Sequence, residues 1–84
     1  MSGVFKAGQL VKPVEWLDED VDLYSIPGGA RPIAGKILPR VISRLGKRDV
    51  ALVIALERAD GGSVYLLGPN GGGWAFGAFI EVIP

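Results

Sequence analysis

Glycine and proline divide this chain into short segments, and no other feature limits its fold as strongly. The 84 residues include 13 glycines and 6 prolines, and these recur along most of the sequence. Both residues interrupt helices and favour turns. Proline lacks an amide donor, and glycine loses more backbone entropy in a helix than any other residue. Breakers between short β-branched runs predict a small all-β domain of about five or six short antiparallel strands. The expected strands are 9–14, 21–26, 33–38, 50–57, 63–67 and 78–83.

The stretch 50–57 gives the clearest strand prediction. Its larger side chains alternate with smaller ones, and the larger ones are Val50, Leu52, Ile54 and Leu56. Alternation with period two places them on one face, which we expect to lie in the core. The Asp60-Gly61 pair then predicts a hairpin to the strand 63–67.

Three other segments carry more specific expectations. Pro13 suggests that 9–14 is an edge strand, because it cannot donate a ladder hydrogen bond. One short helix or helical turn is expected near 39–46, since Pro39 suits a first helical position and Gly46 suits a helix end. The glycines at 71–73 are expected to form a turn between two strands.

Length and composition exclude most catalytic chemistry. A chain of 84 residues is expected to form a single domain, 1–84. It has no Cys and no His, so disulfides, thiol nucleophiles and imidazole acid–base catalysis are excluded. We expect no enzyme activity, no cofactor and no metal. The mean hydropathy of +0.35 is high for so small a domain, which predicts apolar surface left for a partner.

Neither a membrane span nor an export signal is evident, so we expect a soluble protein that is cytoplasmic or within a viral particle.

The zero net charge conceals two segregated stretches. All the charges between 15 and 22 are acidic, namely Glu15, Asp18, Glu19, Asp20 and Asp22, and all those between 31 and 48 are basic, namely Arg31, Lys36, Arg40, Arg44, Lys47 and Arg48. These stretches pair either within one chain or between copies. The D-x-D-x-D spacing of 18–22 resembles a calcium loop, but Leu23 and Gly29 stand where that loop needs Gly and Glu. A solvated acidic loop is therefore the favoured interpretation.

Three stretches in order resemble the bacterial Src-homology-3-type (SH3-like) domain, a small β-barrel. Residues 21–28 (VDLYSIPG) are similar to its opening strand and turn, and 31–38 (RPIAGKIL) to its following strand. Residues 72–83 (GGWAFGAFIEVI) are similar to its ending. The N-terminal segment 1–19, an expected strand and acidic loop, lies outside the match, and 39–49 stands where the family often has a tight turn. The resemblance implies an SH3-like barrel that binds peptides or proteins.

Aromatic and charged side chains are the candidate binding residues. Barrels of this type bind extended peptides on aromatic-lined grooves. Trp16, Tyr24, Trp74, Phe76 and Phe79 form the aromatic set, of which Phe79 is expected in the core. The predicted partner-binding residues are Trp16, Tyr24, Trp74, Asp18, Asp20, Arg40, Arg44 and Arg48.

The expected function is a non-catalytic protein–protein interaction or adaptor module. The alternative is a structural subunit of a larger assembly, such as a phage particle or a homo- or hetero-oligomeric complex. A third alternative, nucleic-acid binding through the basic stretch 31–48, is disfavoured by the isoelectric point of about 6.1.

Overall fold

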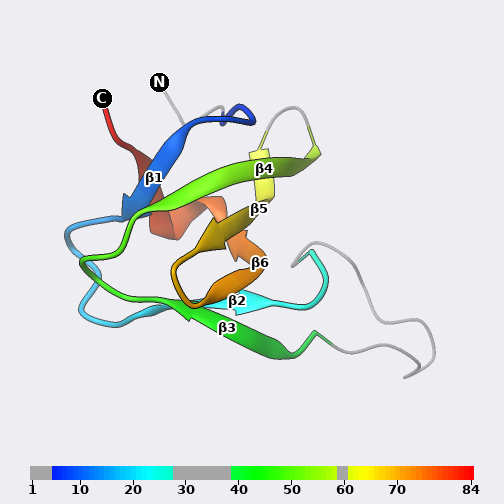
Figure 1. The fold of residues 1–84 in the computed structure, drawn as a ribbon, viewed down its shortest axis with the longest axis horizontal. Coiled ribbons are helices and arrows are strands. Elements are labelled where there is room, and N and C mark those ends of the chain that lie inside the picture. Colours follow the sequence, from blue (N-terminus) through cyan, green and yellow to red (C-terminus); the bar gives the residue numbers. More distant parts are fainter. Residues whose placement is uncertain (1–4, 28–38, 59–60) are drawn as a thin grey trace.

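A computed structural model describes residues 5–27, 39–58 and 61–84. These residues form seven strands and one 3-10 turn (Figure 1). The elements are β1 (Leu10–Pro13), β2 (Val21–Tyr24), β3 (Val41–Leu45), β4 (Ala51–Arg58), β5 (Gly61–Gly68), β6 (Gly71–Phe76), η1 (Gly77–Phe79) and β7 (Ile80–Val82). The all-β prediction is confirmed. The expected strand 33–38 lies outside the described residues.

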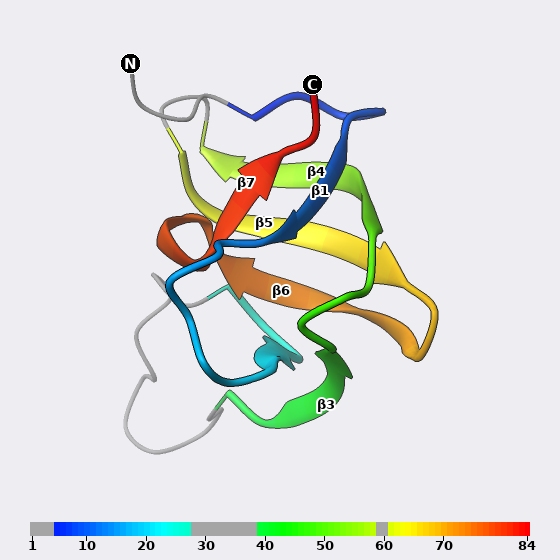
Figure 2. The same ribbon diagram turned by 90° about the vertical axis from the view of Figure 1, so that its left-hand side faces the viewer.

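The strands form a single antiparallel sheet in the order β3-β2-β6-β5-β4-β1-β7. The sheet curls into a half-barrel, with β1 and β7 side by side at one end and β3 at the other (Figure 2). The hairpin predicted after 50–57 is confirmed, because β4 pairs with β5. Pro13 ends β1, which lies between β4 and β7, so the prediction of an edge strand is wrong.

The inner face of the half-barrel holds a core that is aliphatic apart from one aromatic ring. Its members are Phe5, Val11, Val21, Leu23, Leu45, Ala51, Val53, Val64, Leu66, Ala75 and Ile80. Phe5 precedes β1, and the others come from every strand, at alternate positions where a strand supplies two. Six of the seven aromatic residues therefore lie outside the buried core.

The prediction of a helix or helical turn near 39–46 is wrong, because residues 41–45 form strand β3. It pairs antiparallel with β2, and Val21↔Leu45 and Leu23↔Ser43 are opposite each other. Val41 and Ile42 are β-branched and suit a strand, and pairing across the sheet outweighs the helical pattern. The turn that follows is closed by Asp49, whose carboxylate accepts a hydrogen bond from the Gly46 amide at 2.7 Å.

The glycines at 71–73, expected to form a turn, begin strand β6 instead. The turn is formed by Pro69 and Asn70, and Gly71 follows with a φ of +124°. Gly73 is buried where β6 meets β2, and a Cβ there would lie 2.6 Å from the Cβ of Leu23. A glycine is needed at 73 because the two backbones approach too closely for any side chain.

Over residues 51–54, the face of β4 that packs on the core is the opposite of the predicted one, whereas Leu56, beyond a register shift against β5, packs against the core as predicted. Ala51 and Val53 are buried, whereas Val50 and Ile54 are each 45% exposed. Leu52 and Ile54 point outward, and the smaller Ala51 and Val53 lie beneath the curled sheet. Both faces of this strand are therefore apolar, a pattern typical of strands covered on both sides.

Among the residues that the structure describes, no helix has the length and apolar character of a membrane span.

Candidate functional site

Six aromatic side chains gather outside the core and define a surface that we call the aromatic band. Its members are Trp16, Tyr24, Tyr65, Trp74, Phe76 and Phe79. The ring centroids of Trp16 and Phe79 are 6.3 Å apart, and those of Phe79 and Phe76 are 6.1 Å apart. Phe76 continues to Tyr24 at 5.8 Å. The band thus runs from the loop after β1, over η1, to β6 and β2.

Strand register builds the rest of the band. Ala75 is buried, so its neighbours Trp74 and Phe76 point to the outer face of β6. Trp74 is opposite Tyr65 of β5 and Tyr24 of β2. The rings of Tyr65 and Trp74 meet at 5.3 Å. Three neighbouring strands therefore each contribute one outward aromatic ring to a single row.

Exposure varies along the band. Trp16 is 69% exposed, Phe76 39% and Phe79 37%. The prediction that Phe79 lies in the core is wrong, because η1 turns its side chain toward Trp16 and Phe76. Trp74 and Tyr24 are half-buried. Tyr65 was not among the predicted binding residues, although it lies at an alternate position of the strand predicted over 63–67.

The rings meet edge to face rather than lying flat. Their interplanar angles are 67° for Trp16 and Phe79, 67° for Tyr24 and Phe76, and 89° for Phe76 and Phe79. In such pairs the positive edge of one ring faces the negative face of the other. Each pair stabilises the structure by about 0.5–1.5 kcal/mol beyond the effect of area burial. A surface of alternating edges and faces offers crevices for aliphatic side chains more than a flat platform for bases or sugars.

The acidic and basic stretches pair within one chain at two points. The Arg44 guanidinium donates a hydrogen bond to Asp22 Oδ1 at 3.0 Å, and the Lys47 ammonium lies 3.7 Å from Asp18 Oδ1. Asp20, Arg40 and Arg48 form no ion pair within the described ranges 5–27, 39–58 and 61–84. Two of the predicted binding residues, Asp18 and Arg44, are therefore engaged internally.

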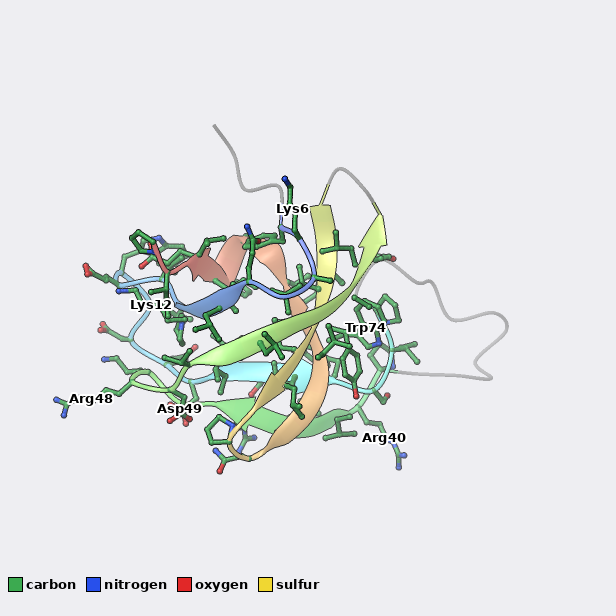
Figure 3. The ribbon with its side chains drawn as sticks, turned by 45° about the horizontal axis from the view of Figure 1, so that its top comes forward. Lys6, Lys12, Arg40, Arg48, Asp49 and Trp74 are labelled. Atoms are coloured by element: carbon green, nitrogen blue, oxygen red, sulfur yellow. The ribbon has the colours of Figure 1, made fainter. Side chains whose placement is uncertain are left out.

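The remaining predicted charges do not converge on one site. Figure 3 places Arg48 and Lys12 on one side of the molecule and Trp74 and Arg40 on the other. A cleft of about 430 Å³ lies beside Arg48 and is lined by Lys12, Pro13, Val14, Glu15, Leu17, Lys47 and Arg48. Its cations are largely balanced, because Lys12 pairs with Glu81 and Lys47 with Asp18.

The Asp22–Arg44 pair is expected to contribute little to stability. Both side chains are well exposed, and exposed ion pairs contribute about 0–1 kcal/mol. A double-mutant cycle with Asp22→Ala and Arg44→Ala, followed by urea unfolding, should give a coupling energy below about 1 kcal/mol. A larger coupling would mean that the charged stretches fix the β2–β3 hairpin.

A second outer surface, which we call the aliphatic patch, lies beside the aromatic band. It consists of Leu10, Val50, Leu52, Ile54 and Leu67. Leu10 of β1 is opposite Leu52 of β4, and Leu52 is opposite Leu67 of β5. Three leucines thus form a straight row across three strands, on the face away from the core.

The described residues contain no group of three or more acidic side chains placed to hold a metal ion. Comparison with protein-family models, curated proteins and solved structures found no match to this chain.

Proposed function

We propose that this protein is a non-catalytic protein-interaction module that binds its partner through the aromatic band. The observation that carries the proposal is the position of the aromatic residues, six of which lie outside the core and form a connected set of edge-to-face pairs and cross-strand neighbours. Exposed aromatic clusters of this kind are enriched at protein interfaces, where a few rings provide most of the binding free energy.

The chemistry of the band favours a protein partner over nucleic acid. Arg44 and Lys47, two cations of the basic stretch, already pair with acids of the same chain. Nucleic-acid sites combine unpaired cations along a groove with rings on which bases stack flat. The edge-to-face rings and the zero net charge fit that description poorly.

The fold is proposed to be of the SH3-like barrel type. Two of the three stretches that carry the resemblance, 21–28 and 72–83, fall largely within described residues and supply β2 and β6. These strands pair directly, at Tyr24 and Trp74. The segments that resemble the family are therefore the ones that build the middle of the aromatic band.

The test uses Trp16→Ala and Phe76→Ala in a binding experiment. A library displaying random peptides and small folded domains is selected on the wild-type protein, and the dissociation constants of the selected binders are measured. We expect each variant to weaken binding about 30-fold, as for interface hot spots. Both should keep a cooperative thermal transition, because these side chains lie outside the core.

Ile42→Ala is the matched control, since Ile42 is exposed on β3 and belongs to neither surface. It should bind like the wild type. The proposal fails if no binder is recovered, or if the selected binders ignore both aromatic substitutions.

A second candidate function is a structural subunit of a larger assembly. The apolar outward face of β4 and β5 favours it, because side chains such as Ile54 of β4 and Leu67 of β5 are more typical of a covered sheet than of a solvated one. The mass of the protein in solution separates a lone module from a subunit.

A further inference from the structure

We propose that Asn70 is a site of spontaneous deamidation, and that the reaction removes a contact between the β5–β6 turn and the edge strand β3. Asparagine is among the thermolabile residues of proteins. Asn70 is exposed in the turn that joins β5 to β6, and it is the only asparagine in the chain. Gly71 follows it directly. This site is separate from the aromatic band of the proposed function.

The reaction needs water and the backbone nitrogen of the next residue. The Gly71 nitrogen loses its proton to a base in solution and attacks Cγ of Asn70, so that a new C–N bond closes a succinimide ring. The bond between Cγ and Nδ2 breaks, and Nδ2 takes up a proton and leaves as ammonia. Water then opens the ring at either carbonyl, which gives aspartate or isoaspartate. The net change is the uptake of one water and the release of one ammonia.

Glycine at position 71 makes the attacking nitrogen accessible. It has no Cβ, so no side chain of its own stands beside that nitrogen. A Cβ built at Gly71 would lie 3.4 Å from Ser43 Oγ and 3.7 Å from Ser43 Cβ, which are ordinary contact distances. The backbone at 71 is therefore not clamped as it is at Gly73, and there is room for the ring to close.

The hairpin slows the reaction without preventing it. Gly71 is opposite Gly68 across β5 and β6, so the turn must open locally before the nitrogen of Gly71 reaches Cγ of Asn70. Local opening of an exposed turn costs much less free energy than global unfolding. We therefore expect the folded protein to react more slowly than the unfolded chain, yet at a measurable rate.

The product cannot make the contact that Asn70 makes. Asn70 Nδ2 donates a hydrogen bond to the backbone carbonyl oxygen of Arg44 in β3, at 3.3 Å. Aspartate and isoaspartate carry a carboxylate oxygen in place of this donor, so two acceptors would face each other. Within the described sheet β3 is an edge strand and pairs with β2 alone. Deamidation should therefore loosen β3 at position 44.

Mass spectrometry of the intact chain tests the modification, because a single asparagine is present. The wild type is incubated for several weeks in mildly alkaline buffer at physiological temperature. It should gain one mass unit per chain, and peptide mapping should find aspartate or isoaspartate at position 70. The chain unfolded in guanidinium chloride should react at least about 10-fold faster, because the hairpin no longer restrains it. A folded protein that keeps its mass while the unfolded chain gains one unit overturns the proposal.

Asn70→Gln is the matched control. Its side-chain carbonyl is one methylene farther from the Gly71 nitrogen and must close a larger ring, so this variant should keep its mass over the same period. A gain equal to that of the wild type would place the reaction elsewhere and overturn the proposal. Trp16→Ala and Phe76→Ala should deamidate like the wild type whether or not they bind a partner, so this proposal and the proposed function fail separately.

Asn70→Asp tests the effect on β3, because it has one of the two products from the start. Loss of the hydrogen bond should lower Tm by about 4–8 °C. Amide hydrogen exchange should become faster in β3 and stay unchanged in β4. A variant with the Tm of the wild type and unchanged exchange in β3 would show that the contact with Arg44 does not hold the edge strand.

Discussion

Gly73→Ala is expected to lower the free energy of unfolding by about 3 kcal/mol, the upper range for overpacking a core. The added Cβ would lie 2.6 Å from the Cβ of Leu23, 3.1 Å from the carbonyl carbon of Leu23 and 3.2 Å from the carbonyl oxygen of Tyr24. Two of these atoms are backbone and the third is fixed to it, so no rotamer change relieves the contact. β2 and β6 must move apart, which loosens the core around Leu23.

Thermal unfolding followed by circular dichroism measures this loss, which corresponds to a fall of roughly 15 °C in Tm for a domain of this size. Gly72→Ala is the matched control on the same strand. Its new Cβ would lie 2.8 Å from Tyr65 Oη, the far end of a side chain, and its nearest backbone contact would be the Leu66 carbonyl oxygen at 3.3 Å. We expect a loss of about 1 kcal/mol there. Equal losses at 72 and 73 would show that β2 and β6 do not meet as closely as described.

The same close approach explains why sequence reasoning missed β6. Consecutive glycines at 71–73 are typical of a turn when neighbours along the chain are all that is considered. Their role is set by Leu23 and Tyr65, which lie on other strands. Once 71–76 is recognised as a strand, alternation predicts the outward positions of Trp74 and Phe76. The missing information was the pairing partner.

The segment 39–46 shows a second limit. Pro39, Gly46 and the apolar spacing of 41–45 fit a helix and a strand about equally over so short a run. Antiparallel pairing with β2 decides between them, since it buries Leu45 beside Val21 and leaves Arg44 beside Asp22. Local propensity is a weak guide where the partner strand lies far along the chain.

Part of the candidate site was predictable. Sequence context predicts Trp16, Tyr24 and Trp74 as binding residues, and all three belong to the aromatic band. Phe79 and Tyr65 required the structure, because a 3-10 turn directs the first outward and strand register aligns the second with Trp74. The charged binding residues are predicted only because acidic and basic residues are segregated along the sequence, and that segregation does not determine where they lie in the fold. They are Asp18, Asp20, Arg40, Arg44 and Arg48.

Val53→Asp is expected to unfold the protein, whereas Ile54→Asp is expected to leave it folded. Val53 is 1% exposed inside the half-barrel, so a carboxylate there is buried among aliphatic side chains without a partner. An uncompensated buried charge costs about 3–5 kcal/mol, comparable with the whole stability of many small domains. Ile54 points outward and is 45% exposed, so a carboxylate there stays hydrated, and the expected change is within about 1 kcal/mol.

This pair of variants distinguishes the two possible faces of β4 directly. The alternation of large and small residues over 50–57 predicts Ile54 in the core, whereas the structure places Val53 there. Far-ultraviolet circular dichroism and urea unfolding at low protein concentration, where self-association contributes nothing, report which variant keeps a cooperative transition. If Val53→Asp stayed folded and Ile54→Asp unfolded, Ile54 and not Val53 would lie in the core. The aliphatic patch would then not be on the surface. The expected result keeps Ile54 on the outer face of β4, where a partner can cover it.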